Sequence, residues 1–157
     1  MIRDGSMDKV RHAEDGGFTM MELTVVLFVM ALVTSASLIG YRSYIHGANI
    51  SALSQVIRNV RTASHQYIQI NSSYSGLSCS SLSTSGIWPP SGCNGSSFAL
   101  SIPQTSVSVA VGSTPYQFSI VILSSYFTDT DFEAICNQFE SQATQCSPSS
   151  GTLTLVF

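Results

Sequence analysis

Gly16-Gly17-Phe18-Thr19-Met20-Met21-Glu22 opens an apolar run that continues to Tyr41, and the rest of the chain is organised around it. Residues 18–41 contain a single formal charge, that of Glu22. A helix of this length rises about 36 Å, at about 1.5 Å per residue, which is enough to cross the hydrocarbon core of a bilayer. A carboxylate inside such a segment is costly and needs a partner. Glu22 therefore needs a functional explanation.

Charged side chains are scarce and unevenly distributed. They make up 10% of the 157 residues, against about 25% in an average soluble domain. All six basic residues lie within the first 61 positions, and residues 62–157 hold acids but no lysine or arginine. A body without cations cannot neutralise phosphates, so we expect no direct binding of nucleic acid.

Four cysteines, Cys79, Cys93, Cys136 and Cys146, lie beyond the apolar run. An even number in a Ser-rich region of low charge indicates disulfides and an oxidising compartment. Three pairings are possible, and we favour Cys79–Cys93 with Cys136–Cys146 because they close the shortest loops. A zinc site is the alternative, but the spacings match no common zinc pattern and the histidines all lie upstream. We therefore expect no metal site.

Residues 1–17 are polar and are expected to be a removable leader. An ordinary secretory signal is the alternative, with Leu23–Val33 as its apolar region and Thr34-Ser35-Ala36 as its cleavage site. Against it, residues 1–22 hold five acids and three bases, whereas such signals normally begin with net positive charge. Three bases precede the apolar run and only Arg42 closely follows it, so the positive-inside rule keeps the N-terminus cytoplasmic and exports the body.

Apolar residues continue beyond Tyr41 at steps of three and four, as on one face of an amphipathic helix. No proline interrupts residues 18–70. The pattern predicts one long helix that is apolar all round over residues 18–41 and amphipathic over residues 42–70. Gly40 and Gly47 are the expected bending points, because glycine costs about 1 kcal/mol relative to alanine within a helix.

Residues 71–157 are predicted to form a globular body with disulfides. Period-two alternation of apolar residues predicts strands, which we place at 98–102, 107–111, 116–123 and 153–157. They are expected to form an antiparallel sheet of about four strands, with one face on a core. The predicted fold class is α+β, with the long helix packed on this sheet.

A C-terminal helix is predicted to begin at Thr130-Asp131-Phe132-Glu133, which fits a capping box. Its buried side chains are expected to be Phe132, Ile135, Cys136 and Phe139. A cation site at Asp129, Asp131 and Glu133 is the alternative, but these acids lack EF-hand spacing. Helix capping explains them better.

The sequence contains no motif for catalysis. It has no Gly-rich phosphate loop, no His-Glu-x-x-His, no CxxC and no Gly-x-Ser-x-Gly. His46 and His65 fall on the polar side of the predicted long helix and are expected to be solvated or interface residues. We therefore expect no enzyme activity, no catalytic residue and no cofactor.

Gly16-Gly17-Phe18-Thr19-x-x-Glu22 and the unbroken apolar helix after it resemble the class III signal of type IV prepilins, the N-methylphenylalanine type. The resemblance covers the leader, the long helix and the α+β body, and it implies the type IV pilin fold. Within that family the layout is similar to the type IVb branch, in particular to major pilins of the PilS type from conjugative and secretory pili. The residues that carry this narrower similarity are Tyr74-x-Gly76-Leu77, Trp88-Pro89 and the late cysteine pair.

The resemblance implies a role for each of these segments. A prepilin peptidase would cut between Gly17 and Phe18 and methylate the new amino group of Phe18. Residues 18–41 would anchor the subunit in the inner membrane, with the body in the periplasm. An assembly ATPase and a platform protein would then extract it into an extracellular pilus, a homopolymer serving adhesion, conjugation or secretion. A minor pilin or a type II secretion pseudopilin is the alternative, and a soluble exported domain is a third possibility.

Glu22 is expected to pair with an amine. The apolar run holds no lysine or arginine, and the nearest amine after cleavage would be the N-terminus of Phe18, about one helical turn away. The N-terminus of a neighbouring subunit would be equally available once helices bundle. Because breaking a buried ion pair costs about 3–5 kcal/mol, we hypothesise that Glu22 sets the axial register between subunits.

Overall fold

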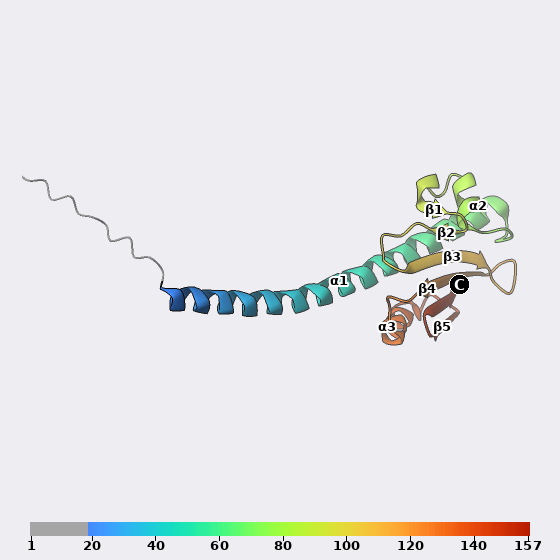
Figure 1. Ribbon diagram of the computed structural model, residues 1–157. Coiled ribbons are helices and arrows are strands. Elements are labelled where there is room, and N and C mark those ends of the chain that lie inside the picture. Colours follow the sequence, from blue (N-terminus) through green and yellow to red (C-terminus); the bar gives the residue numbers. More distant parts are fainter. Residues whose placement is uncertain (1–18) are drawn as a thin grey trace, which may run out of the picture. The chain divides into compact units, whose positions relative to one another are not determined.

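The computed structural model describes residues 19–157 (Figure 1). The expected leader, residues 1–17, and Phe18 lie outside the described residues. The chain divides into two compact units, one ending at Ser43 and the other comprising Tyr44–Phe157. Helix α1 (Met20–Asn71) contributes to both units. A single long helix is therefore present, as the periodicity predicts.

Helix α1 continues through Gly40 and Gly47 and ends where the sequence pattern predicts. Its last turn is closed by Ser72, whose N–H donates to the carbonyl of Ile68 at 2.7 Å. Ser72 has a φ of 60°, the left-handed conformation that commonly terminates helices.

The apolar periodicity of α1 becomes a buried face only from Leu53 onward. Leu53, Ile57 and Val60 are completely buried, and Tyr67 is nearly so. Tyr44, in contrast, is exposed, although it belongs to the same sequence pattern. Within the second unit, this face of α1 and the strands contribute to one hydrophobic core.

The second unit contains a six-stranded antiparallel sheet in the order β1-β2-β3-β4-β6-β5, rather than the expected four strands. Its strands are β1 (Cys93–Asn94), β2 (Ser97–Phe98), β3 (Thr105–Val111), β4 (Phe118–Ser124), β5 (Gln145–Ser149) and β6 (Thr152–Val156). The central ladder pairs β3 with β4 over seven residues, and β4 with β6 over five. These central strands match the predicted alternation.

The strand expected over residues 98–102 is wrong beyond Phe98. The N–H of Ala99 still donates to the carbonyl of Gly92 at 2.9 Å, in register with β1, but the pairing of β2 with β3 ends at Phe98. Ile102 is nevertheless buried, which is why its alternation resembled a strand. The strand expected from Tyr116 begins instead at Phe118, because the N–H of Gln117 closes a turn on Thr114 at 3.1 Å.

Two short helical segments, α2 (Cys79–Thr84) and the 3-10 turn η1 (Pro90–Gly92), occupy the Ser-rich region. Helix α3 (Asp129–Phe139) is the predicted C-terminal helix, but its cap is Thr128, not Thr130. The N–H of Thr128 donates to Asp131 Oδ2 at 2.8 Å, and the N–H of Asp131 donates to Thr128 Oγ1 at 3.4 Å. The spacing Thr-x-x-acid occurs twice here, and the earlier pair closes both bonds of the capping box.

Two disulfides tie the helices to the edges of the sheet. Cys79–Cys93 joins α2 to β1, and Cys136–Cys146 joins α3 to β5. This is the local pairing favoured by loop length. Helix α3 buries three apolar side chains, Phe132, Ile135 and Phe139, whereas Cys136 is only half-buried, contrary to expectation.

Candidate functional site

The first unit presents an apolar surface on every side of its helix. Thirteen large apolar side chains between Met20 and Ile39 are exposed, each by 47% to 90%. Because no face is covered by residues 19–157, this segment needs another apolar phase around it, either lipid or other helices. An 18-residue window of α1 has a mean hydropathy of 2.3, so α1 is long and apolar enough to cross a membrane. We call Met20–Tyr41 the apolar segment.

The serine and threonine hydroxyls of the apolar segment are satisfied within their own helix. Thr24 Oγ1 donates to the carbonyl of Met21 at 2.8 Å, and the later hydroxyls do the same three or four residues back. The later donors are Thr34, Ser35 and Ser37, with distances of 2.9, 2.6 and 2.8 Å to their carbonyls. Such bonds allow these residues to lie in hydrocarbon without unpaired polar atoms.

Glu22 differs from these hydroxyls. Its backbone N–H donates to the carbonyl of Thr19 at 3.0 Å and to Thr19 Oγ1 at 3.3 Å, so Thr19 caps the helix. The carboxylate itself has no hydrogen bond or ion pair with any group in residues 19–157. The candidate site is thus a capped helix start carrying one exposed carboxylate at the edge of an apolar surface. Gly17 and Phe18, the other predicted site residues, lie outside the described residues.

Within the second unit, α1 makes two polar contacts with the segment around the start of α3. His46 Nε2 lies 3.1 Å from Asp131 Oδ1, and Asn49 Nδ2 donates to the hydroxyl of Tyr126 at 3.1 Å. Burial alone raises the pKa of Asp131, but hydrogen bonds from Thr128 and His46 outweigh it and hold that pKa below its ordinary value. His46 is therefore an interface residue, one of the two roles expected for it.

His65 also lies at a contact within the second unit. Its Nδ1 is 3.2 Å from the hydroxyl of Tyr74, and its ring meets the edge of Phe118. Burial lowers the pKa of His65, and the nearby Arg61 guanidinium lowers it further. Arg61 donates to Gln142 Oε1 and lies 5.4 Å from the centre of the Phe157 ring. These contacts hold the polar side of α1 against the end of the sheet.

The described residues offer little material for other chemistry. No group of three or more His, Cys, Asp or Glu side chains in residues 19–157 is placed to hold a metal ion. All four cysteines are in disulfides, so none of them is a free thiol. Asp129 and Asp131 lie in the first turn of α3, where Asp131 completes the capping box.

Sequence reasoning missed two features of these sites. Thr19 is the helix cap, and the spacing Thr19-x-x-Glu22 would have identified it. The contact of Asn49 with Tyr126 joins residues 77 positions apart and left no local signal.

Comparison with protein-family models, with curated protein sequences and with solved structures finds no match to this chain. The fold itself defines the class: an α+β protein with a long apolar N-terminal helix, an antiparallel sheet, a C-terminal helix and two disulfides. The function has to be argued from the chemistry of its residues.

Proposed function

We propose that this chain is the precursor of a type IV pilus subunit. A prepilin peptidase would cut it between Gly17 and Phe18 and methylate the Phe18 amine. Before assembly, the subunit would be anchored in the inner membrane with its body in the periplasm. An assembly ATPase and a platform protein would then polymerise it through α1 into an extracellular filament. The observation that carries this proposal is the carboxylate of Glu22, the charged side chain of the apolar segment, which has no partner among the described residues.

Cleavage after Gly17 would supply that partner. The new amine would lie four residues before Glu22, about 6 Å along a helix axis, and would be cationic when protonated. The start of α1 also carries the positive end of the helix dipole, which favours a nearby carboxylate. The uncleaved chain lacks this cation. Processing would therefore create the charge that makes Glu22 tolerable in an apolar environment.

The apolar segment suits both proposed states of the subunit, the one in the membrane and the one in the filament. Apolar side chains exposed on all sides can be covered by lipid in the membrane and by other copies of the helix in a filament. A subunit that leaves the membrane must pack its helix against other copies, because so large an apolar surface is unfavourable in water. A Glu22 carboxylate that pairs with the N-terminal amine of a neighbouring subunit would fix the axial register between the two helices.

The second unit fits an exported body. Its two disulfides are typical of a periplasmic or extracellular domain. A minor pilin or a type II secretion pseudopilin would share this build. The abundance of the chain in purified filaments separates a major pilin from those alternatives.

The experiment compares Glu22→Gln with wild type in cells that assemble the filament. Glutamine keeps the size and removes the charge, so we expect export and processing to persist and assembly to fall at least tenfold. Mixed expression should lower the filament yield of the wild type. Thr24→Ala is the matched control, because that hydroxyl bonds only within its helix, and it should assemble normally. Full assembly of Glu22→Gln, alone and mixed, would contradict the proposal.

A further inference from the structure

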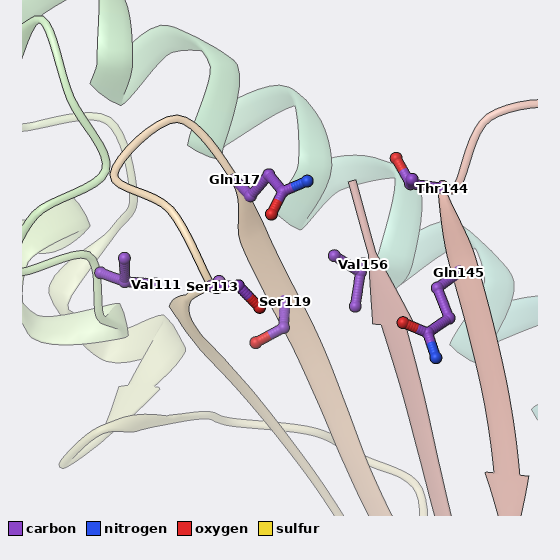
Figure 2. Close-up of a pocket in the computed structure, with 8 residues that line it drawn as sticks. Val111, Ser113, Gln117, Ser119, Thr144, Gln145 and Val156 are labelled. Atoms are coloured by element: carbon purple, nitrogen blue, oxygen red, sulfur yellow. The ribbon is translucent and has the colours of Figure 1, made fainter.

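The outward face of the sheet carries a hollow of about 510 Å³ that the proposed function does not use (Figure 2). Its floor is a row of cross-strand neighbours, Ser119 on β4, Val156 on β6 and Gln145 on β5. With strands about 4.8 Å apart, this row spans about 10 Å. The floor is therefore an extended platform, with an aliphatic side chain between a hydroxyl and an amide.

The turn between β3 and β4 forms one wall of the hollow. Gly112 N–H donates to the carbonyl of Gln117 at 2.8 Å. A Cβ on Gly112 would lie 2.8 Å from that of Gln117, so the turn has no room for a side chain there. Ser113 and Thr144 also line the hollow. Figure 2 shows the amides of Gln117 and Gln145 on either side of Val156.

The polar side chains of the hollow have open hydrogen-bonding capacity. Among residues 19–157, the side chains of Gln117, Ser113, Ser119 and Thr144 make no hydrogen bond. Gln145 makes a single long one, to Ser147 Oγ at 3.4 Å. An amide offers two donors and an acceptor, and a hydroxyl offers one donor and two lone pairs. This set can pair with groups that both donate and accept.

Charge narrows the class of ligand. No ionisable side chain lines the hollow, and no lysine or arginine follows Arg61 in the chain. Glu140 lines an adjoining hollow of about 290 Å³ that shares Thr144 and Gln145 with this one. Phosphate, sulfate or carboxylate groups would meet no cation among the lining residues, and the nearby Arg61 is already bonded to Gln142, so anions are disfavoured. A cationic ligand would find no carboxylate within the hollow itself.

We propose that this hollow is a binding site for a neutral saccharide. The hydroxyls of a sugar both donate and accept, as the amides and hydroxyls here require, and its C–H face matches the aliphatic side chains of Val111 and Val156. The site does not rest on the pilus assignment, because an exported domain with the same body would carry the same hollow.

The test is a titration of the full chain, labelled with nitrogen-15, in phosphocholine micelles that carry no sugar headgroup. Lactose, cellobiose and chitobiose are the neutral probes, and 3′-sialyllactose is the charged counterpart of lactose. At least one neutral probe should give saturable amide shifts in residues 111–119, 144–146 and 156. The charged probe should bind at least tenfold more weakly than lactose if lactose is the ligand, and should give no shifts if another sugar is.

Three variants locate the site. Gln117→Ala and Gln145→Ala should each weaken binding about threefold to tenfold, the effect of losing one hydrogen bond. Gln138→Ala, an exposed glutamine on α3 outside the hollow, should bind as wild type. Gln145 is exposed on an edge strand, so Gln145→Ala should leave the fold intact. This variant therefore still tests the binding site if Gln117→Ala disturbs the turn.

Several results would overturn the proposal. They are the absence of shifts with all three neutral sugars, saturable binding of 3′-sialyllactose as tight as that of lactose, and wild-type affinity in both glutamine variants. Shifts in the same residues with the uncharged peptide Ser-Thr-Val-Thr-Ser, but with none of the sugars, would assign the hollow to a peptide and also overturn it.

Discussion

His46 Nε2 lies 3.1 Å from Asp131 Oδ1, so one carboxylate both bonds α1 and caps α3. The two residues are 85 positions apart in the chain. The other oxygen of Asp131 accepts from the backbone N–H and the hydroxyl of Thr128 at 2.8 and 2.7 Å. The start of α3 and its contact with α1 therefore depend on the same side chain.

This shared role predicts unequal costs for the two partners. Asp131→Ala should lower the free energy of unfolding of the body by about 1–2 kcal/mol, because it removes the Asp131 half of the capping box together with the contact to α1. His46→Ala should cost less than about 1 kcal/mol, because its imidazole is about a third exposed to solvent. Chemical denaturation of the full chain in micelles measures both. A larger loss from His46→Ala than from Asp131→Ala would show that the cap is not the main role of Asp131.

The lowered pKa of His65 predicts that stability falls on mild acidification. The folded state holds this imidazole neutral, so below about pH 6.5 the unfolded chain binds more protons and gains free energy relative to the folded chain. The thermal midpoint should drop between pH 7 and pH 5, and His65→Gln should flatten that part of the profile. Below about pH 4 a second loss is expected in both proteins, as Asp131, whose folded pKa is lowered, becomes protonated. A profile over pH 5–7 that is the same with and without His65 would exclude it as the cause.

Phe118 is predicted to be a major support of the core. It is completely buried, stacks on Phe157 with ring centres 5.2 Å apart, and contacts Tyr74 at 4.8 Å. Phe118→Ala should cost about 3–5 kcal/mol, since it removes transfer free energy and leaves a cavity. Tyr116→Ala, at a neighbouring position that is 70% exposed, should change stability by no more than about 0.5 kcal/mol. Similar losses from the two variants in denaturant titrations would contradict this role of Phe118.

The two disulfides are predicted to contribute similarly to stability. They close loops with sequence separations of 14 and 10 residues, for which chain entropy gives about 3 kcal/mol each. Replacing both cysteines of either pair by serine should therefore lower the free energy of unfolding by similar amounts. Peptide mapping of the exported protein supplies a direct check. A peptide joining Cys79 to Cys136 or Cys146 would contradict the pairing.

The long helix, the central strands and the local disulfides were predictable because each has a strong local signal. The heptad-like spacing of Leu53, Ile57 and Val60 identifies the buried face of α1. Strand β5 escaped prediction because Gln145–Ser149 has no apolar alternation and contains Pro148. Proline is tolerated there because β5 is the last strand of the sheet.

The candidate sites were predictable only in part. Glu22 is conspicuous in the sequence because it is a charge in an apolar run. The hollow beside Gln117 and Gln145 is not, because it is assembled where β6 pairs with both β4 and β5, and it contains no rare residue type. Contacts made across the sheet leave no periodic pattern along the chain.

We propose that Glu22 acquires its partner when the chain is cut before Phe18. The most direct test is the intact mass and N-terminal fragment spectrum of the exported protein. We predict a chain that begins at Phe18 and carries one methyl group on its amine. A mature N-terminus near residue 37, or an uncut chain in the exported fraction, would contradict the account.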